Sequence, residues 1–406
     1  RVAALRAWLG HTGRGNMNKA NFRTRSIAAA CGTALSAVIA IGAAAAADMP
    51  IKAPPPIQDS GNLFWAEIDY LGWSVKGDHP PPLVTTSPAG TPRPQAGVVG
   101  LPTTTVLFGD SSVNGAWRSG GRLQAGYWFD PQRTRGIEAS FFDLQDASTG
   151  FATDSNAHPI VGRPFFNVLT MQPDVSGVGF PGAITGSVAV NESSRLLGFD
   201  THYRQYIGTW SGQQVSALIG YRYLRSSDNL SIPEAINAVG FGAFSSINSF
   251  GATGNFHGVD LGAAGEFKRG PWMVEWRGTL ALGAVFNSAA INGSTTANFG
   301  GGVTTQPGGL LALSSNIGNF SQTRFSVVPE LALKASYQFA PRWRLVAGYD
   351  LLYWTEVQRA GGLIDTAVNP NLAPPAAGGG PLRPMPVFNT SSLMAQGFNL
   401  GVRYNY

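Results

Sequence analysis

The sequence predicts an all-β protein, a transmembrane antiparallel β-barrel of about ten strands, and three features lead to that class. Amphipathic segments with a period of two recur along the chain, and the last of them ends at the C-terminus. Short and long connections alternate between these segments. The composition, with 52 Gly, 27 Pro and only 13% charged residues, suits a barrel with long polar loops.

The N-terminal region predicts a secretory signal. Residues 1–47 hold six basic residues and no acid, and an uncharged run over 27–47 closes on three alanines. Met17 is the expected start, which leaves residues 1–16 upstream of it. A transmembrane anchor is the alternative, because the run is nearly long enough, but its Ala and Gly content and the cleavage site favour a signal.

Removal of this leader changes the charge and the cysteine content. Subtracting its six basic residues from 28 leaves 22 against 23 acids, a net charge near −1 in place of +5, so nothing indicates nucleic-acid binding. Cys31 is the only cysteine, so the mature chain has no disulfide or thiolate metal site. Residues 48–61 form a Pro-rich periplasmic linker, and 62–406 form the barrel.

Ten segments have the alternation and length that a tilted membrane-spanning strand needs. In the segment 213–225, for example, Val215, Ile219 and Tyr221 alternate with Gln214, Gly220 and Arg222. The predicted strands are 62–73, 117–129, 135–145, 194–207, 213–225, 256–267, 272–284, 325–339, 343–355 and 393–406.

The connections predict the topology. Short turns at 130–131, 208–212, 268–271 and 340–342 alternate with Gly-, Pro-, Ser- and Asn-rich stretches at 74–116, 146–193, 226–255, 285–324 and 356–392. This alternation places both termini on the side of the short periplasmic turns and the long loops outside. Twelve strands are possible if 285–324 hides a hairpin, for which Leu310–Leu313 is the candidate.

Aromatic residues predict two membrane interfaces, because rings with one polar edge prefer that boundary. Core tryptophans of a sandwich are the alternative. The predicted interface residues are Trp128, Trp210, Trp272 and Trp343 near the short turns, and Trp73, Trp117 and Trp354 near the long loops. Phe398, Leu400, Val402, Tyr404 and Tyr406 share one face of the last strand and are the expected signal for the barrel-assembly machinery.

The opposite faces of the strands carry charges of both signs. The predicted lumen residues are Arg122, Glu138, Arg204, Arg222, Asp260, Glu275, Arg277, Glu330, Lys334, Arg344, Asp350 and Arg403, with Glu67, Asp69, Asp200 and Glu266 on the same face. Paired charges could fill a narrow barrel, or they could line a water channel and set ion selectivity. Mixed signs in near balance favour filling or weak selectivity.

An outer-membrane enzyme is the rival class, and its candidate residues are the histidines. His79 and His158 precede prolines in loops, His257 lies near Ser249 and Asp260, and His202 shares a strand with Asp200 and Arg204. None has a spacing that demands catalysis, and no HExxH or phosphate loop is present. The sequence therefore predicts no enzymatic activity and no metal or other cofactor.

Several motifs resemble those of the putative beta-barrel porin family 7 of bacterial outer-membrane proteins. They are Phe64–Tyr70, Gly126–Asp130, Gly136–Glu138, Gly220–Leu224, Leu280–Gly283, Val328–Leu331, Gly348–Trp354, Ile364-Asp365 and Gln396–Gly401, and they span most of 62–406. The chain departs from the family pattern at Ala360, where a proline is expected, and at Leu393-Met394, where an aromatic pair is expected. The resemblance implies an outer-membrane barrel, and its "porin" label follows mainly from architecture.

Two functions are therefore expected for a protein of the Gram-negative outer membrane. The first is a passive pore for ions or small solutes. The alternative is a closed barrel whose low-charge loops serve adhesion, receptor contact or membrane integrity. Outer-membrane lipid, periplasmic chaperones and the barrel-assembly machinery are the expected partners, and the oligomeric state is open.

Overall fold

The computed structural model describes residues 63–299, 302–375 and 378–406. The predicted leader and linker lie outside these residues. Strands account for most of the described chain, and its three 3-10 turns span Arg93–Gln95, Gly361–Leu363 and Pro370–Leu372. Within these ranges no helix has the length and apolar character needed to cross a membrane.

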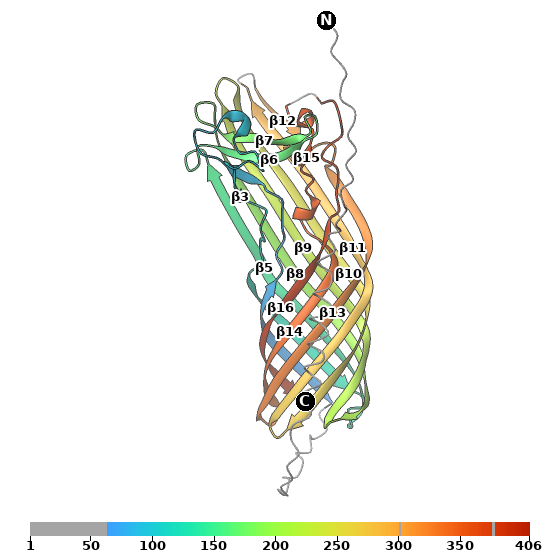
Figure 1. Cartoon of the computed structure of the whole chain (residues 1–406). Helices are drawn as coiled ribbons and strands as arrows, with labels where there is room; N and C mark the ends of the chain where they lie inside the picture. The colour runs from blue at the N-terminus through green and yellow to red at the C-terminus, as the bar shows by residue number, and fades with distance from the viewer. Residues whose placement is uncertain (1–62, 300–301, 376–377) are drawn as a thin grey trace, which may run out of the picture. The chain divides into compact units, whose positions relative to one another are not determined.

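Ten antiparallel strands close into a ring, which confirms the predicted fold class (Figure 1). Each strand pairs with its neighbours along the chain, and the ring closes where β1 pairs with β16 from Trp65–Asn405 to Val75–Ala395. The ring strands are β1 (Phe64–Val75), β4 (Trp117–Trp128), β5 (Arg135–Asp154), β8 (Ile184–Trp210), β9 (Gln213–Ala238), β10 (Gly242–Arg269), β11 (Trp272–Asn298), β13 (Gly318–Ala340), β14 (Trp343–Gln358) and β16 (Thr390–Asn405).

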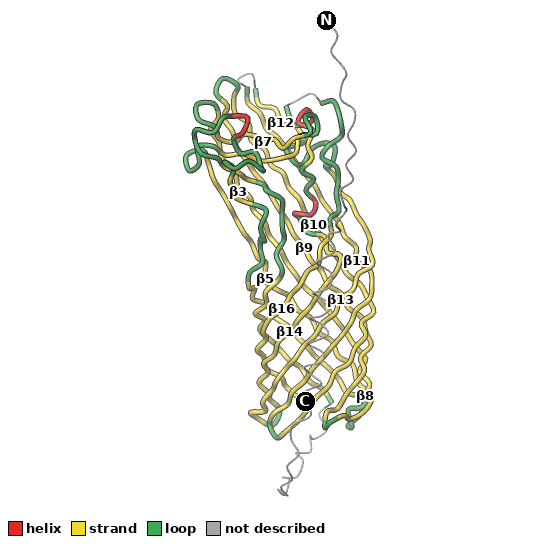
Figure 2. Tube along the Cα trace, viewed as in Figure 1, coloured by secondary structure: helices red, strands yellow, loops and turns green. Residues whose placement is uncertain are grey.

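A second, smaller sheet lies at the end of the barrel opposite the short turns, as Figure 2 shows, and we call it with its loops the head. Its strands come from three of the long connections. They are β2 (Val84–Thr86), β3 (Thr105–Phe108), β6 (Val161–Asn167), β7 (Gln172–Gly179) and β15 (Ala367–Val368). Among the strands of the described residues, the short β12 (Val303–Pro307) pairs with β11 alone and is not part of the ring.

One predicted long loop is wrong. Residues 226–255 are almost entirely strand, because β9 and β10 pair up to a turn at residues 239–241. Strands β8 and β11 likewise continue through 184–193 and 285–298. The alternation continues in these extensions, but the apolar residues change to the inner face, so a search for outward apolar residues ends too early.

Strand β9 shows this inversion within one regular strand. Up to Tyr223 the outward residues are apolar or aromatic and the inward Arg222 is charged. From Arg225 onward the outward residues are mostly polar, with Pro233 and Ala235 as the exceptions, while the inward Leu230 and Ile232 are fully buried. We call the part below this boundary the lower barrel and the part above it the upper barrel. The outward apolar stretch covers about ten residues per strand, the length that crosses a membrane.

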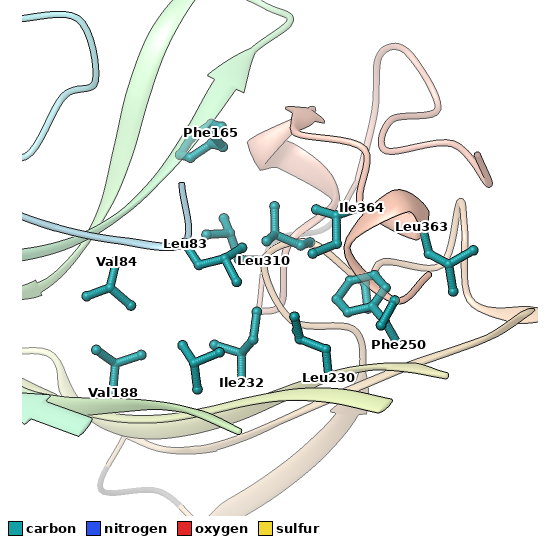
Figure 3. Packing of buried hydrophobic residues seen from close by; sticks show 14 of the residues in the cluster. Leu83, Val84, Phe165, Val188, Leu230, Ile232, Phe250, Leu310, Leu363 and Ile364 are labelled. Carbon is teal, nitrogen blue, oxygen red and sulfur yellow. The ribbon is translucent and has the colours of Figure 1, made fainter. Parts of the chain in front are cut away.

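The upper barrel and the head share one hydrophobic core. In Figure 3, Leu83, Val84 and Phe165 of the head lie over Val188 and Ile232 of the barrel wall. Loop residues from other connections, including Leu310, Leu363 and Ile364, complete the cluster. A sheet face that buries apolar side chains inward and exposes polar ones outward has the pattern of a soluble protein.

The segment Leu310–Leu313 is buried in this core and is not the strand that the twelve-strand alternative required. The side chain of Asn248, on β10, holds the segment in place. Its Oδ1 atom accepts hydrogen bonds from the backbone N–H groups of Leu310, Leu311 and Ala312 at 3.0, 2.9 and 3.1 Å. Because Asn248 is fully buried, these bonds satisfy backbone donors that no water can reach.

Candidate functional site

Charged side chains on the inner face of the lower barrel form ion pairs across the lumen. Arg222 donates from Nε to Asp260 at 2.7 Å and also contacts Glu330 of β13. Arg277 of β11 lies 2.5 Å from Glu138 of β5. Three strands separate β5 from β11 in the ring, so this pair bridges the barrel axis. The lumen is narrow enough for opposite walls to touch.

A second group of charges lies beside the first. Arg122 donates to Asp69 at 2.9 Å and to Asp350 at 3.0 Å, although β4 and β14 are not neighbours. Lys334 contacts Glu67 on β1. Buried charges of both signs placed this closely satisfy one another at a large desolvation cost. The arrangement fills the lower lumen with polar material.

The other predicted lumen residues complete this network. His202 lies between Asp200 at 3.3 Å and Asp260 at 3.0 Å, so its ring packs among the carboxylates of the network. Arg403 lies 2.6 Å from Glu67 and 2.9 Å from Glu275. Arg204 lies 3.8 Å from Glu138 and 3.9 Å from Glu266. Arg344 donates hydrogen bonds to Ser336, Gln338 and the Pro271 carbonyl. All twelve predicted lumen residues thus lie inside the barrel, and their role in a conducting path stays a prediction.

The lower lumen keeps a cavity of about 80 Å³ toward the short turns. The guanidinium groups of Arg204 and Arg403 lie 5.0 Å from the ring centres of Trp128 and Trp65 on its lining. Its volume holds a few water molecules.

An apolar layer crosses the barrel directly above the charges. Nine of the ten ring strands contribute side chains to it, and each is at most 5% exposed. Trp73 and Trp354 are its largest members, and Leu71, Leu224 and Phe256 are among the others. Because these residues belong to the barrel wall, movement of a loop alone does not remove them from the lumen.

A buried polar layer separates the apolar layer from the head core. Asp228 lies on β9 between Leu224 below and Leu230 above, and its carboxylate contacts the Arg359 guanidinium. Arg359 also donates to the Lys76 carbonyl at 3.1 Å. Two connections that are far apart in the sequence are therefore attached to the wall at the same level.

Glu192 of β8 belongs to the same layer, beyond the outward Arg195 and thus outside the apolar band. Burial raises the pKa of Glu192 to about 8, and the charges of Asp78 and Asp228 act in the same direction. The side chain is 1% exposed. It is therefore a neutral acid at pH 7 in the folded protein.

A second ion pair attaches the head higher on the same strand. Arg163 of β6, fully buried, lies 3.2 Å from Glu234 of β9, which also accepts a bond from Ser246 at 2.6 Å. Sequence reasoning missed Arg163, Arg359, Glu192, Asp228 and Glu234. The signal for Asp228 and Glu234 was their even spacing from Arg222 along β9, which places all three on the inner face.

Three of the seven predicted interface tryptophans are wrong. Trp73, Trp128 and Trp354 are buried inside the barrel at 1%, 7% and 0% exposure. The period-two alternation already places them on the inner face, because each is an even number of residues from an inward charged residue on the same strand. These residues are Asp69, Arg122 and Asp350 respectively. Trp117, Trp210, Trp272 and Trp343 are exposed on the outer face, as are Phe398, Leu400 and Tyr406 of the terminal segment, with Val402 and Tyr404 half-buried beside them.

The other three histidines of the described residues each have one polar neighbour. His79 lies 3.8 Å from the exposed Asp110, His158 bonds to Thr153 at 2.8 Å, and His257 bonds to Tyr221 at 2.6 Å on the outer face. In the described part of the chain, no group of three or more His, Cys, Asp or Glu side chains is arranged to hold a metal ion.

A family model described as "Putative beta barrel porin-7" matches residues 65–406. No curated protein matches the chain. Among solved structures, the outer membrane protease OmpT from Escherichia coli is 8% identical, with a TM-score of 0.40 over 86% of this chain and 98% of its own. The translocator domain of the autotransporter NalP from Neisseria meningitidis is 9% identical, with a TM-score of 0.24 over 94% and 97%. A Pseudomonas aeruginosa FadL homologue is 9% identical, with a TM-score of 0.21 over 86% and 92%.

Proposed function

The chain belongs to the putative beta barrel porin-7 family of outer-membrane barrels, and on that premise we propose a barrel that is closed to free diffusion and carries a folded head for contacts at the cell surface. This is the second of the two functions expected from the sequence. The apolar layer is the observation that carries the proposal. A permanently open pore needs a continuous aqueous path, and Trp73 and Trp354 lie across the place where it would run.

The head supports a role outside the membrane. Its core includes residues of the upper barrel wall, so it is a folded body and not a set of free loops. Long structured connections that are rigidly held are typical of surfaces that bind a partner. The proposal includes no catalytic activity and no cofactor.

Conductance tests the closed state. Refolded residues 48–406 are added to a planar bilayer after heat-dependent gel mobility has verified folding, with a general-diffusion porin as the positive control. We expect no open steps from the folded protein. Reproducible ohmic steps at low voltage would contradict the proposal and restore the passive pore.

A gated pore is the second candidate, because the lower lumen is charged and the head is attached by buried ion pairs such as Arg359–Asp228. Openings that appear only at high voltage, or only in Asp228→Ala, would favour it in the same recording. Export by a cleaved signal and assembly through periplasmic chaperones belong to the proposal as well. N-terminal sequencing of the mature protein tests the cleavage and is expected to begin near residue 48.

A further inference from the structure

Over β8, β9, β10, β11 and the start of β13, the outer face of the upper barrel is a broad sheet surface with no charged side chain, and the carboxylate of Asp154 on β5 lies at its edge opposite Ser187. We call this surface the outer wall, and it comprises the outward positions of 185–193, 227–237, 243–253, 288–298 and 319–323. Within these five described ranges the outward residues are Ser, Thr and Asn, with a few Ala and one each of Ile, Pro and Gly. An ordinary exposed protein surface has about a quarter to a third of charged residues.

The register arranges these side chains in rows across the strands. One row runs Asn191, Ser231, Ser249 and Asn292 over β8, β9, β10 and β11. Outward residues that are directly opposed lie about 5 Å apart, so the row presents hydroxyl and amide groups at a regular spacing.

A second row lies closer to the end of the barrel. It contains Ser187, Ser245, Thr296 and Thr305, and the last two hydroxyls bond to each other at 2.9 Å. A groove of about 650 Å³ crosses this row, and a second of about 480 Å³ adjoins it. Ser187, Ala235 and one carboxylate, that of Asp154, lie in both linings. The surface therefore has grooves in which a chain-like ligand can lie.

The chemistry of the wall selects an uncharged, hydroxyl-rich partner. Hydroxyl and amide side chains both donate and accept hydrogen bonds, as sugar hydroxyls do, whereas Lys only donates and an ionised Glu only accepts. Neutral polar groups are also cheaper to remove from water than charges are. A charged polymer such as a nucleic acid would have no counter-charge on this surface.

The position of the wall identifies the source of such a partner. The wall continues each strand directly from the outward apolar band, so it stands beside the headgroup region of the outer leaflet. The Arg225 and Arg195 side chains mark the boundary on β9 and β8. Anything attached to the headgroups of the surrounding lipids therefore lies against this surface first.

We propose that the outer wall binds uncharged saccharide chains carried by the lipids of the surrounding outer leaflet. This inference rests on the proposed surface role, because it names the chemistry of the contact. It does not depend on whether the lumen is closed, so conductance and saccharide binding can fail independently.

The test is titration calorimetry of full-length mature protein in lipid nanodiscs. The probe is the soluble polysaccharide, with an uncharged repeat, released by mild acid from a long-chain lipopolysaccharide; lipid A without sugars is the second probe. The variant Ser231→Lys with Ser249→Lys places two charges in the first row, and their flexible stems keep the ammonium groups in water when no ligand is bound. The control, Thr103→Lys with Ser111→Lys, adds the same charges at exposed head positions outside the wall.

We expect polysaccharide binding that the wall variant weakens by about tenfold or more, because ligand contact would desolvate the added charges, and that the control leaves unchanged. Equal binding by the wall variant would overturn the inference, and so would binding of lipid A alone. Light scattering on both variants measures their oligomeric state. A change of oligomeric state in the wall variant without a change in polysaccharide binding would make the wall an interface between copies and would also overturn the inference.

Discussion

The lower and upper barrels are built from the same strands but have opposite surfaces. In the lower barrel apolar side chains face out and charges face in, whereas in the upper barrel a hydrophobic core faces in and hydroxyl and amide groups face out. Strand β9 passes from one to the other with unbroken alternation between Arg222 and Ile232. The strand backbone therefore has the same geometry in both parts, and only the outward and inward side chains show where the membrane ends.

The largest expected effect is in the lower barrel, where Arg222→Met would leave Asp260 and Glu330 without their shared partner. Removing one member of a buried ion pair costs about 3–5 kcal/mol, because the remaining charge stays in a low-dielectric interior. The measurement is the free energy of unfolding in urea, followed by tryptophan fluorescence in detergent micelles.

The matched control is Arg195→Met on the outer face, where Arg195 is 50% exposed at the side chain and Arg222 only 2%. An exposed pair contributes less than about 1 kcal/mol. An equal decrease in the free energy of unfolding for the two variants would mean that the lower lumen is hydrated enough to screen its charges.

The next largest expected effect is a dependence of the free energy of unfolding on pH, and it originates in the upper barrel. Folded Glu192 keeps its proton up to a pKa of about 8, whereas the unfolded chain loses it near 4.5. Between these values the native state binds more protons, so the free energy of unfolding falls as pH rises, by an amount on the order of a few kcal/mol.

Glu192→Gln should remove this slope while leaving the stability at pH 4 nearly unchanged. Urea titrations of both proteins at pH 4, 6, 8 and 9 measure it. Parallel curves for the two proteins would show that Glu192 ionises at its ordinary pKa and that water reaches the polar layer.

A smaller and more local effect is expected from Asn248→Ala. Three backbone donors lose their common acceptor, at a cost of about 2 kcal/mol, because loop rearrangement and water recover part of the loss. Limited proteolysis should then cut within 308–317 while heat-dependent gel mobility reports an intact lower barrel.

Asn292→Ala on the outer wall is the control and should change stability by no more than about 0.5 kcal/mol. If Asn248→Ala unfolded the whole barrel, the upper and lower parts would be one cooperative unit, and the distinction between them would be only chemical.

The smallest effect is expected at the membrane interface. Trp343→Ala removes an outward ring that lies 4.8 Å from Tyr404, a pair that contributes about 1 kcal/mol. Unfolding in lipid vesicles measures it. A loss as large as that of Arg222→Met would show that anchoring in lipid, and not the charge network, dominates the stability of the lower barrel.

The sequence was sufficient to predict all ten ring strands, because apolar residues alternate outward in each of them. It was insufficient for the upper barrel, since the outward apolar signal ends at Tyr223 while the strand continues to Ala238. The interface tryptophans show a related error. Trp354 was assigned by its distance from a loop, although its parity with Asp350 places it inside.

The candidate site was predictable as a set of residues but not as a set of contacts. Alternation placed Arg277 and Glu138 on the inner face, yet their meeting across the axis depends on the radius of the ring. The departure from the family pattern at Ala360 turned out to be compatible with the fold. Its φ of −61° is the value that a proline requires, so either residue suits the turn that follows Arg359.

The shared core of head and wall has a practical consequence for peptide display. In barrels whose loops are free, a foreign peptide can replace almost any outer connection. Here an insertion at 308–313 would remove Leu310–Leu313 from the core and the bonds that Asn248 accepts. The three-residue turn at 239–241, whose Val239 and Phe241 side chains are exposed, is the position where an epitope tag can be added without disturbing that core.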